Sequence, residues 1–318
     1  MTGGIVTVLG ENVADTFADP TQGPTGTDGE LMLRVLPGGS PANTAVALAR
    51  LGTRTRFLGR FSGDVFARAF RDRLTSSGVK LTGSVRAAEP STLAVATLDE
   101  RGGAAYSFHA EGTADWQWTA EELPAHVLDE TVCLHTGSIA LGRAPGGRVI
   151  EEFAEAARYR ATISIDPNVR LPLVTLDGLR DRLPYWCALA DVLKLSDDDL
   201  ALLYPGWSIE RACDEWHAAG AELVVVTRGA EGAVASLRGE RVSVPGFRVA
   251  VVDTVGAGDA FTAGLLHWLN GEQLLGGRLT GLEIGQVREA VGFAARVAAL
   301  TCSVAGANPP WADVLPSA

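Results

Sequence analysis

From residue 131 onward, short apolar runs alternate with helical patterns, and this alternation constrains the fold more than any other feature. A helical pattern such as 146–160 separates one strand-like run from the next. Such alternation predicts an α/β fold, with a parallel sheet covered by helices on both faces. The strand-like runs of this part of the chain are 131–135, 161–165, 191–195 and 222–226.

Polar side chains follow several of these runs. The carboxyl ends of parallel strands share one edge of the sheet, where ligands bind in open α/β folds. Asp166 and Asp199 are candidates for holding Mg²⁺, often through water; the alternative for each is a turn or helix-capping role. Asp15, after the first strand-like run, is either a hydrogen-bond acceptor for a polar ligand or a loop residue capping its own turn.

The length of 318 residues suits one large α/β domain or two smaller ones. We find no repeat, low-complexity tract or linker that would split it, so we expect a single domain over 1–318. Two stretches, about 11–35 and 90–115, contain strand patterns outside the alternation, including a hairpin of 91–98 with 104–109. We expect them to form a small lid.

Composition excludes several classes of function. The chain has 27 Lys and Arg against 38 Asp and Glu, a net charge of −11, and it has no basic block, which argues against a nucleic-acid partner. The histidines lack metal-binding spacing, and no signal peptide or membrane-length apolar run is evident. The widely spaced cysteines indicate reduced thiols in a cytoplasmic protein; they are Cys133, Cys187, Cys213 and Cys302.

The stretch 253–266 is the most informative single motif. We predict a strand ending at Asp253, a tight turn through Gly256, Ala257 and Gly258, and then a helix. The first N–H groups of a helix lack internal partners, so this turn is a ready anion site. Asp259 then has two interpretations: it favours the helix dipole, or it is a general base beside a phosphate cradle.

The stretch 38–52 is the second informative motif. Gly38 and Gly39 allow positive φ and close approach of the backbone to a ligand. Ser40 is the expected N-cap of the helix that follows. The amide of Asn43, in its first turn, either reaches a ligand or assists the cap.

Together, 38–52 and 253–266 resemble the two signatures of the ribokinase-like (PfkB) carbohydrate kinases, and the resemblance covers essentially the whole chain. It implies a ribokinase-like fold with a nine-stranded type of central sheet and a β-lid. Four further stretches look most like those of bacterial fructokinases: Gly10-Glu11…Asp15, Gly112–Asp115, Asp166–Arg170 and Lys194–Asp199.

The resemblance also implies an activity, which is ATP-dependent phosphorylation of a sugar hydroxymethyl group. Asp259 would take the hydroxyl proton, and the N–H groups of Gly256, Ala257 and Gly258 would form the anion hole. The sugar-binding residues implied are Asp15, Gly38, Gly39 and Asn43, with Arg170 as a further candidate.

The cofactors implied are ATP, Mg²⁺ and K⁺. Asp199 would hold Mg²⁺ through water, and the backbone carbonyls of Asp253 and Val255, with the loop near 302–307, would bind K⁺. The expected nucleotide-binding residues are Lys194, Ser196, Thr227, Gly229, Gly232, Gly256 and Gly258.

The chain departs from the family pattern in three places. Ser196 and Asp199 replace Asn and Glu of an Asn-x-x-Glu motif, which favours a water-mediated metal contact. Ala295 replaces an Asn near the nucleotide. The lid stretch 107–110 lacks an Arg that 2-keto-3-deoxygluconate kinases use to bind a carboxylate. A neutral sugar is therefore favoured.

We therefore predict a fructokinase-like enzyme. The alternatives are a kinase of ribose, 2-keto-3-deoxygluconate or a nucleoside, or a catalytically silent regulator that binds sugar or nucleotide. A dehydrogenase is disfavoured because Phe261 stands where its fingerprint needs Gly or Ala. A covered outer face of the lid would suit a homodimer, although Trp116 and Trp118 could equally pack within the subunit.

Overall fold

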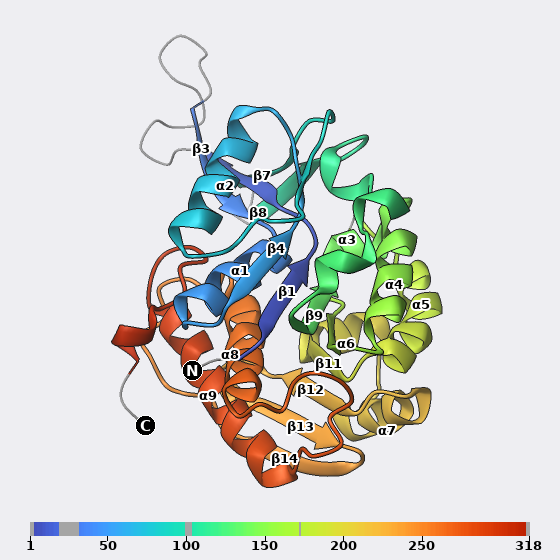
Figure 1. Ribbon diagram of the computed structural model, residues 1–318. Helices are drawn as coiled ribbons and strands as arrows, with labels where there is room; N and C mark the ends of the chain where they lie inside the picture. The colour runs from blue at the N-terminus through green and yellow to red at the C-terminus, as the bar shows by residue number, and fades with distance from the viewer. Residues whose placement is uncertain (1–2, 19–31, 99–103, 172, 316–318) are drawn as a thin grey trace.

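The computed structural model describes residues 3–18, 32–98, 104–171 and 173–315 (Figure 1). Its main sheet has the order β14-β13-β12-β11-β10-β9-β1-β4, parallel except for the β12-β13-β14 meander. This confirms the predicted α/β fold. The strands are β1 (Ile5–Leu9), β4 (Thr55–Leu58), β9 (Thr131–Gly137), β10 (Thr162–Asp166), β11 (Val192–Ser196), β12 (Leu223–Thr227), β13 (Ala233–Leu237) and β14 (Glu240–Val244).

Helices cover both faces of this sheet, and most strand side chains are therefore buried on both sides. One face packs against α1 (Ser40–Arg50), α2 (Val65–Ser76), α8 (Ala257–Gly271) and α9 (Ile284–Cys302). The opposite face packs against α3 (Ser138–Gly142), α4 (Gly146–Ala157), α5 (Leu176–Leu189), α6 (Asp197–Leu203) and α7 (Ile209–Ala219). Figure 1 shows the two groups on either side of the strands.

A second, four-stranded sheet has the order β3-β2-β7-β8. It contains the predicted hairpin, whose turn at 99–103 lies outside the described residues. In Figure 1 this sheet lies beyond the upper end of β1 and β4. Its strands are β2 (Val13–Ala18), β3 (Leu33–Gly38), β7 (Thr92–Leu98) and β8 (Ala104–His109).

The remaining elements are short. Strands β5 and β6 pair only with each other among the described residues. Trp116 and Trp118 are 1% and 2% exposed and belong to the core cluster beside α4, so both pack within the subunit. The short elements are β5 (Arg60–Phe61), β6 (Val85–Arg86), η1 (Ala114–Trp116), η2 (Ala120–Glu122), η3 (Ala125–Leu128), η4 (Gly229–Glu231) and η5 (Ala312–Val314).

Two expectations about strands were wrong. The run ending at Asp253 is not a strand: Val251 and Val252 are 65% and 63% exposed, and the N–H groups of Val252 and Asp253 both donate to the Cys302 carbonyl. Among the described residues the main sheet has eight strands, whereas nine were expected. The outer side of β4 carries an isolated bridge between Arg56 and Lys80 in place of a ninth strand.

Within the described residues, no helix combines the length and the apolar character that a membrane crossing needs. Cys133, Cys187 and Cys213 are buried and Cys302 is partly exposed, and all four are free thiols.

Candidate active site

A cleft of about 640 Å³ lies between the four-stranded sheet and the carboxyl ends of the main strands. The four-stranded sheet contributes Asp15 and Phe108, and the starts of α1 and α8 contribute Asn43 and Asp259. Arg170, after β10, also lines the cleft. Many of the residues selected from the sequence are therefore brought together, although they come from distant parts of the chain.

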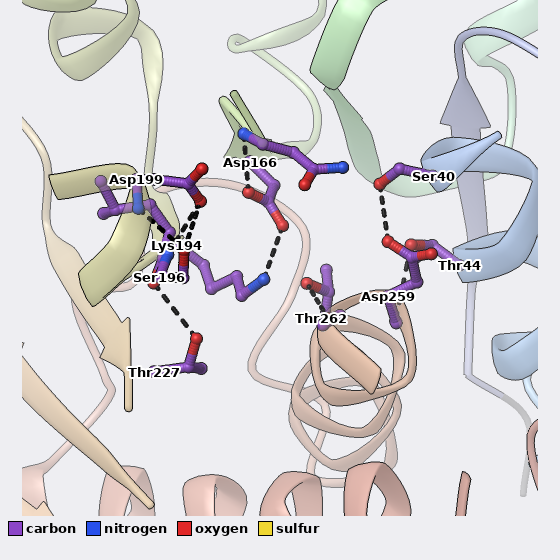
Figure 2. Close-up of polar contacts among 12 residues, drawn as sticks. Ser40, Thr44, Asp166, Lys194, Ser196, Asp199, Thr227, Asp259 and Thr262 are labelled. Atoms are coloured by element: carbon purple, nitrogen blue, oxygen red, sulfur yellow. Dashed lines mark hydrogen bonds and ion pairs between the residues drawn. The ribbon is translucent and has the colours of Figure 1, made fainter. Parts of the chain in front are cut away.

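Asp259 lies in the first turn of α8 and is 9% exposed. Its Oδ1 accepts a hydrogen bond of 2.7 Å from the Ser40 hydroxyl, and its Oδ2 accepts one of 2.9 Å from Asn43 Nδ2. Figure 2 shows Ser40 and Asp259 pointing toward each other. Burial raises the pKa of Asp259, and the two hydrogen bonds oppose that rise.

Ser40 is not the N-cap that its position predicted. Gly39, with φ 97°, holds the cap position, and Ser40 is the first residue of α1. A serine N-cap would accept a hydrogen bond from a backbone N–H two or three residues on. Here the Ser40 hydroxyl donates to the Asp259 carboxylate instead, because an ionised acceptor gives a stronger hydrogen bond than a neutral group.

The glycine turn opens α8. Gly256 has φ 78°, and a Cβ placed on it would lie 2.6 Å from Ala307 Cβ, so only glycine fits there without strain. Gly256 and Gly258 line the cleft. The N–H of Ala257, by contrast, donates to the Thr254 carbonyl at 3.2 Å. Of the three residues predicted to form the anion hole, Gly256 and Gly258 therefore line the cleft, whereas the N–H of Ala257 is hydrogen-bonded within the turn.

Asp15 lies opposite Asp259 in the cleft. Burial raises its pKa to about 6; the Arg73 guanidinium opposes the rise, the Asp259 carboxylate adds to it, and Arg170 opposes it. A Cβ on Gly38 would lie 2.0 Å from Asp15 Oδ2, so the carboxylate rests directly on the glycine backbone. Gly39 packs similarly against the Glu11 backbone.

Most of the residues predicted for the nucleotide and metal lie at the carboxyl ends of β11 and β12 or just beyond them. Lys194 forms a 2.7 Å ion pair with Asp166 in which both side chains are buried, as Figure 2 shows. A Cβ on Gly258 would lie 3.1 Å from Lys194 Nζ, which places the ammonium beside the start of α8. Thr227 Oγ1 donates to the Leu195 carbonyl at 3.4 Å.

Asp199 has the capping role that was one of its two interpretations. Ser196 and Asp199 form a capping box at the start of α6. Asp199 Oδ2 accepts hydrogen bonds from the Ser196 N–H and hydroxyl, and Oδ1 accepts one from the Val169 N–H. Three of roughly four acceptor positions on this carboxylate are therefore occupied. Within the described residues, no three His, Cys, Asp or Glu side chains form a metal cluster.

Further residues of the nucleotide and cation predictions lie in turns. Gly229 and Gly232 have φ 50° and 93° at the two ends of the η4 turn. Asp253 holds two segments together, since its carboxylate accepts hydrogen bonds of 3.0 Å from the Val255 N–H and 2.8 Å from the Gly306 N–H. The segment before α8 is thus attached to the loop that follows α9.

Two charged residues that were given no role from the sequence also face this site. Arg73, in the last turn of α2, donates to Asn43 Oδ1 at 2.9 Å. Glu11 is 1% exposed, and its Oε2 accepts a 3.0 Å hydrogen bond from the Ala140 N–H. Burial raises the pKa of Glu11 to about 7. Only the Gly10-Glu11 part of the family resemblance pointed toward Glu11; the sequence held no signal for Arg73.

A sequence model described as pfkB family carbohydrate kinase matches residues 8–313, which is nearly the whole described chain. The chain belongs to the pfkB family of carbohydrate kinases. The glycine turn with Asp259 at the start of α8 is therefore part of a carbohydrate kinase fold, and the dehydrogenase alternative is excluded.

Curated relatives of this pfkB kinase include two bacterial fructokinases. The enzyme of Rhizobium leguminosarum bv. trifolii is 36% identical over 250 residues, covering 78% of this chain and 76% of the relative. The enzyme of Klebsiella pneumoniae is 37% identical over 270 residues, covering 84% of each.

Solved structures similar to this chain also include fructokinases. The fructokinase of Xylella fastidiosa with bound ATP superposes with a TM-score of 0.86 at 29% identity, covering 95% of this chain and 93% of that one. The fructokinase of Vibrio cholerae O395 in its fructose, ADP and calcium ion bound form superposes with a TM-score of 0.80 at 29% identity, covering 96% and 95%.

Proposed function

We propose that this pfkB kinase transfers the γ-phosphoryl group of ATP to a hydroxymethyl group of fructose, with Asp259 as the general base. The observation that carries the proposal is the buried Asp259 carboxylate in the first turn of α8, within a cleft also lined by Gly256, Gly258 and Asp15. Similarity to fructokinases of several organisms supports fructose as the acceptor.

The proposed reaction needs one proton acceptor. Asp259 takes the proton of the sugar hydroxyl as its oxygen bonds to the γ-phosphorus. The bond from that phosphorus to the β,γ-bridging oxygen breaks, and ADP leaves with the electron pair. The N–H groups of Gly256, Ala257 and Gly258, with the Lys194 ammonium, stabilise the charge on the transferring group. Ala257 can take part once its N–H turns from Thr254 toward the phosphate.

The sugar would lie between the four-stranded sheet and α1. Asp15 and Asn43 offer a carboxylate and an amide to the hydroxyl groups, and Arg170 adds a cation on the opposite wall. Gly38 and Gly39 let the backbone approach the ligand closely. We propose that the four-stranded sheet acts as the lid of a single kinase domain and excludes water from the reacting groups.

The nucleotide would bind along β11, β12 and the start of α8. We assign its contacts to Lys194, Ser196, Thr227, Gly229, Gly232, Gly256 and Gly258. Mg²⁺, when bound, would neutralise part of the negative charge of the phosphates. The acceptor position left on Asp199 suits a metal-bound water better than direct ligation, and the carbonyls of Asp253 and Val255 would hold K⁺ beside the 302–307 loop.

The lid supports a neutral acceptor. The stretch 107–110 carries no arginine, and Phe108 lines the cleft in this region. Arg170 is a cation of the cleft that a sugar acid could use, so 2-keto-3-deoxygluconate remains the main alternative, with ribose and nucleosides after it. A silent regulator is disfavoured because Asp259 and the glycine turn are both retained.

The outer face of the lid supports a homodimer. Leu33 and Val35 on β3 are each 38% exposed, and Val35 pairs with Thr16 on the face opposite Asp15. Exposed apolar side chains on a sheet favour contact with another surface. We propose that a second copy of this chain covers this face, which sedimentation equilibrium of the purified protein would test.

The experiment that tests the proposed reaction is a coupled ADP-release assay with Mg²⁺, ATP and K⁺. Fructose, ribose, 2-keto-3-deoxygluconate, glucose and adenosine are compared as acceptors at equal concentration. We expect kcat/KM to be highest for fructose. Higher kcat/KM for 2-keto-3-deoxygluconate would overturn the acceptor, and no turnover with any acceptor would overturn the reaction.

A further inference from the structure

We propose that Arg73 is a positioning residue that orients Asn43 against Asp259 and joins the lid to the loop behind the glycine turn. The inference rests on the proposed kinase function and goes beyond it, because it assigns a role to a side chain on α2. Arg73 itself is not required to contact the sugar or ATP for this role.

Arg73 and Asp259 together fix the orientation of the Asn43 amide. Asn43 has one acceptor oxygen and one donor nitrogen at the end of its side chain. Arg73 Nη1 donates to the oxygen at 2.9 Å, and the nitrogen donates to Asp259 Oδ2 at 2.9 Å. If the amide turned over, its oxygen would face the carboxylate and its nitrogen would face the guanidinium, and both contacts would be repulsive. Arg73 therefore fixes the orientation that stabilises the ionised base.

Arg73 also binds two backbone carbonyls. Besides Asn43, Arg73 donates to the Pro37 carbonyl at 2.5 Å and to the Ala307 carbonyl. Pro37 belongs to strand β3 of the lid sheet and directly precedes Gly38. Ala307 packs against Gly256, where an added Cβ would meet it at 2.6 Å. One guanidinium thus holds the lid strand, α1 and the loop that supports the glycine turn.

Arg73 also contributes to the charge of the site. Arg73 faces the carboxylates of Asp15 and Asp259 and lies near the cation of Arg50. Burial lowers the pKa of Arg73 to about 10, so it is protonated at neutral pH. Arg170 faces both carboxylates as well, and Lys194 faces Asp259. Removing Arg73 subtracts one of these cations, so the pKa values of both carboxyl groups should rise.

A purely structural role would have different consequences. A basic residue in the last turn of a helix commonly stabilises the helix dipole, and any cation does this about equally well. The bonds to Pro37, Asn43 and Ala307 come instead from two separate nitrogens of a planar guanidinium. A lysine carries its three donors on a single nitrogen and cannot reproduce that geometry. The Arg73→Lys variant therefore separates a helix-dipole role, which it would preserve, from the positioning role, which it would not.

The test compares Arg73→Met and Arg73→Lys with Arg68→Met, an exposed arginine of the same helix. Steady-state kinetics with fructose and ATP are recorded between pH 5 and 9. We expect Arg73→Met to lower kcat about 10- to 100-fold, to leave the KM for ATP within about 2-fold, and to move the acid limb of kcat upward by about half a pH unit or more. Arg73→Lys should keep the acid limb near its wild-type position and still lose about 10-fold in kcat.

A double-mutant cycle completes the test. Because Arg73 acts partly through Asn43, adding Arg73→Met to Asn43→Ala should lower kcat by a clearly smaller factor than Arg73→Met does in the wild type. Independent, multiplicative losses would overturn the inference, as would unchanged kcat in Arg73→Met or wild-type kcat in Arg73→Lys. If Arg73→Met does not fold, the cycle is measured with Arg73→Lys. Wild-type turnover tests the proposed kinase function separately, since its absence would contradict that function whatever the variants do.

Discussion

The Ser40 hydroxyl donates a 2.7 Å hydrogen bond to the carboxylate of Asp259, although 219 positions separate the two residues. This bond joins the starts of α1 and α8, the two helices that carry the glycine-rich motifs. It also helps to keep the buried carboxylate ionised, because a hydrogen bond to the charged form of an acid lowers its pKa.

Replacement of Ser40 by alanine should therefore raise the pKa of Asp259 further. The base would then be protonated up to a higher pH, so the acid limb of the kcat profile should move upward by about one pH unit. At pH values on the acid side of this limb, kcat should fall about 3- to 10-fold. Ser243→Ala, on the exposed side of β14, is the matched control, and an unmoved acid limb in Ser40→Ala would contradict the prediction.

The Gly256→Ala variant should lose both stability and activity. Its φ of 78° is unfavourable for alanine, and the new Cβ would lie 2.6 Å from Ala307 Cβ. We expect a loss of about 1–3 kcal/mol in the free energy of unfolding, measured with denaturant and tryptophan fluorescence. Gly271→Ala, in open space at the end of α8, should instead stabilise by about 0.4–1 kcal/mol. Equal effects of the two substitutions would refute this account of the turn.

Lys194→Met should destabilise the protein strongly, because it leaves the buried Asp166 without its partner. Breaking a buried pair by removing one member costs about 3–5 kcal/mol, whereas neutralising both members costs much less. Adding Asp166→Asn to Lys194→Met should therefore restore much of the lost unfolding free energy. The KM for ATP should stay raised in the double variant, and a KM equal to that of wild type would remove Lys194 from the nucleotide site.

Glu11→Gln should change how stability depends on pH. Burial raises the pKa of Glu11 from an ordinary value of 4.5 to about 7 in the folded state. The folded state then binds more protons than the unfolded state between these values, so the wild type loses stability as the pH rises through this window. Relative to wild type, the variant should gain about 3 kcal/mol between pH 4.5 and pH 8. Denaturant unfolding measures this difference, and a constant value across the window would argue against the raised pKa.

Most of the fold could be predicted from local sequence patterns. The parallel strands β9 to β12 are short apolar runs, and their alternation with helices predicts a parallel sheet. The order of the strands in that sheet is known only from the structure. The exception is instructive: Val251 and Val252 have β-forming side chains, yet this segment lies exposed and donates two N–H groups to the Cys302 carbonyl. Its conformation is set by that contact with the end of α9.

The candidate site could be predicted only in part. Gly256 and Asp259 were found because a glycine turn and a first-turn carboxylate are local features. The roles of Ser40 and Arg73 depend on contacts with Asp259 and Ala307, more than 200 residues away, and no local pattern encodes them. For Asp199, the sequence allowed both metal binding and capping, and hydrogen bonds with three backbone or hydroxyl groups in the structure identify the cap.

The most direct test of the account compares wild type with Asp259→Asn in fructose-dependent ADP release. The variant keeps the shape of the side chain and can still bond to Ser40, but it cannot accept the sugar proton. We predict that kcat falls at least about 10²-fold, with ATP binding by calorimetry and the melting temperature close to wild type. Fructose-dependent turnover within a few-fold of wild type in Asp259→Asn would contradict the assignment of Asp259 as the base.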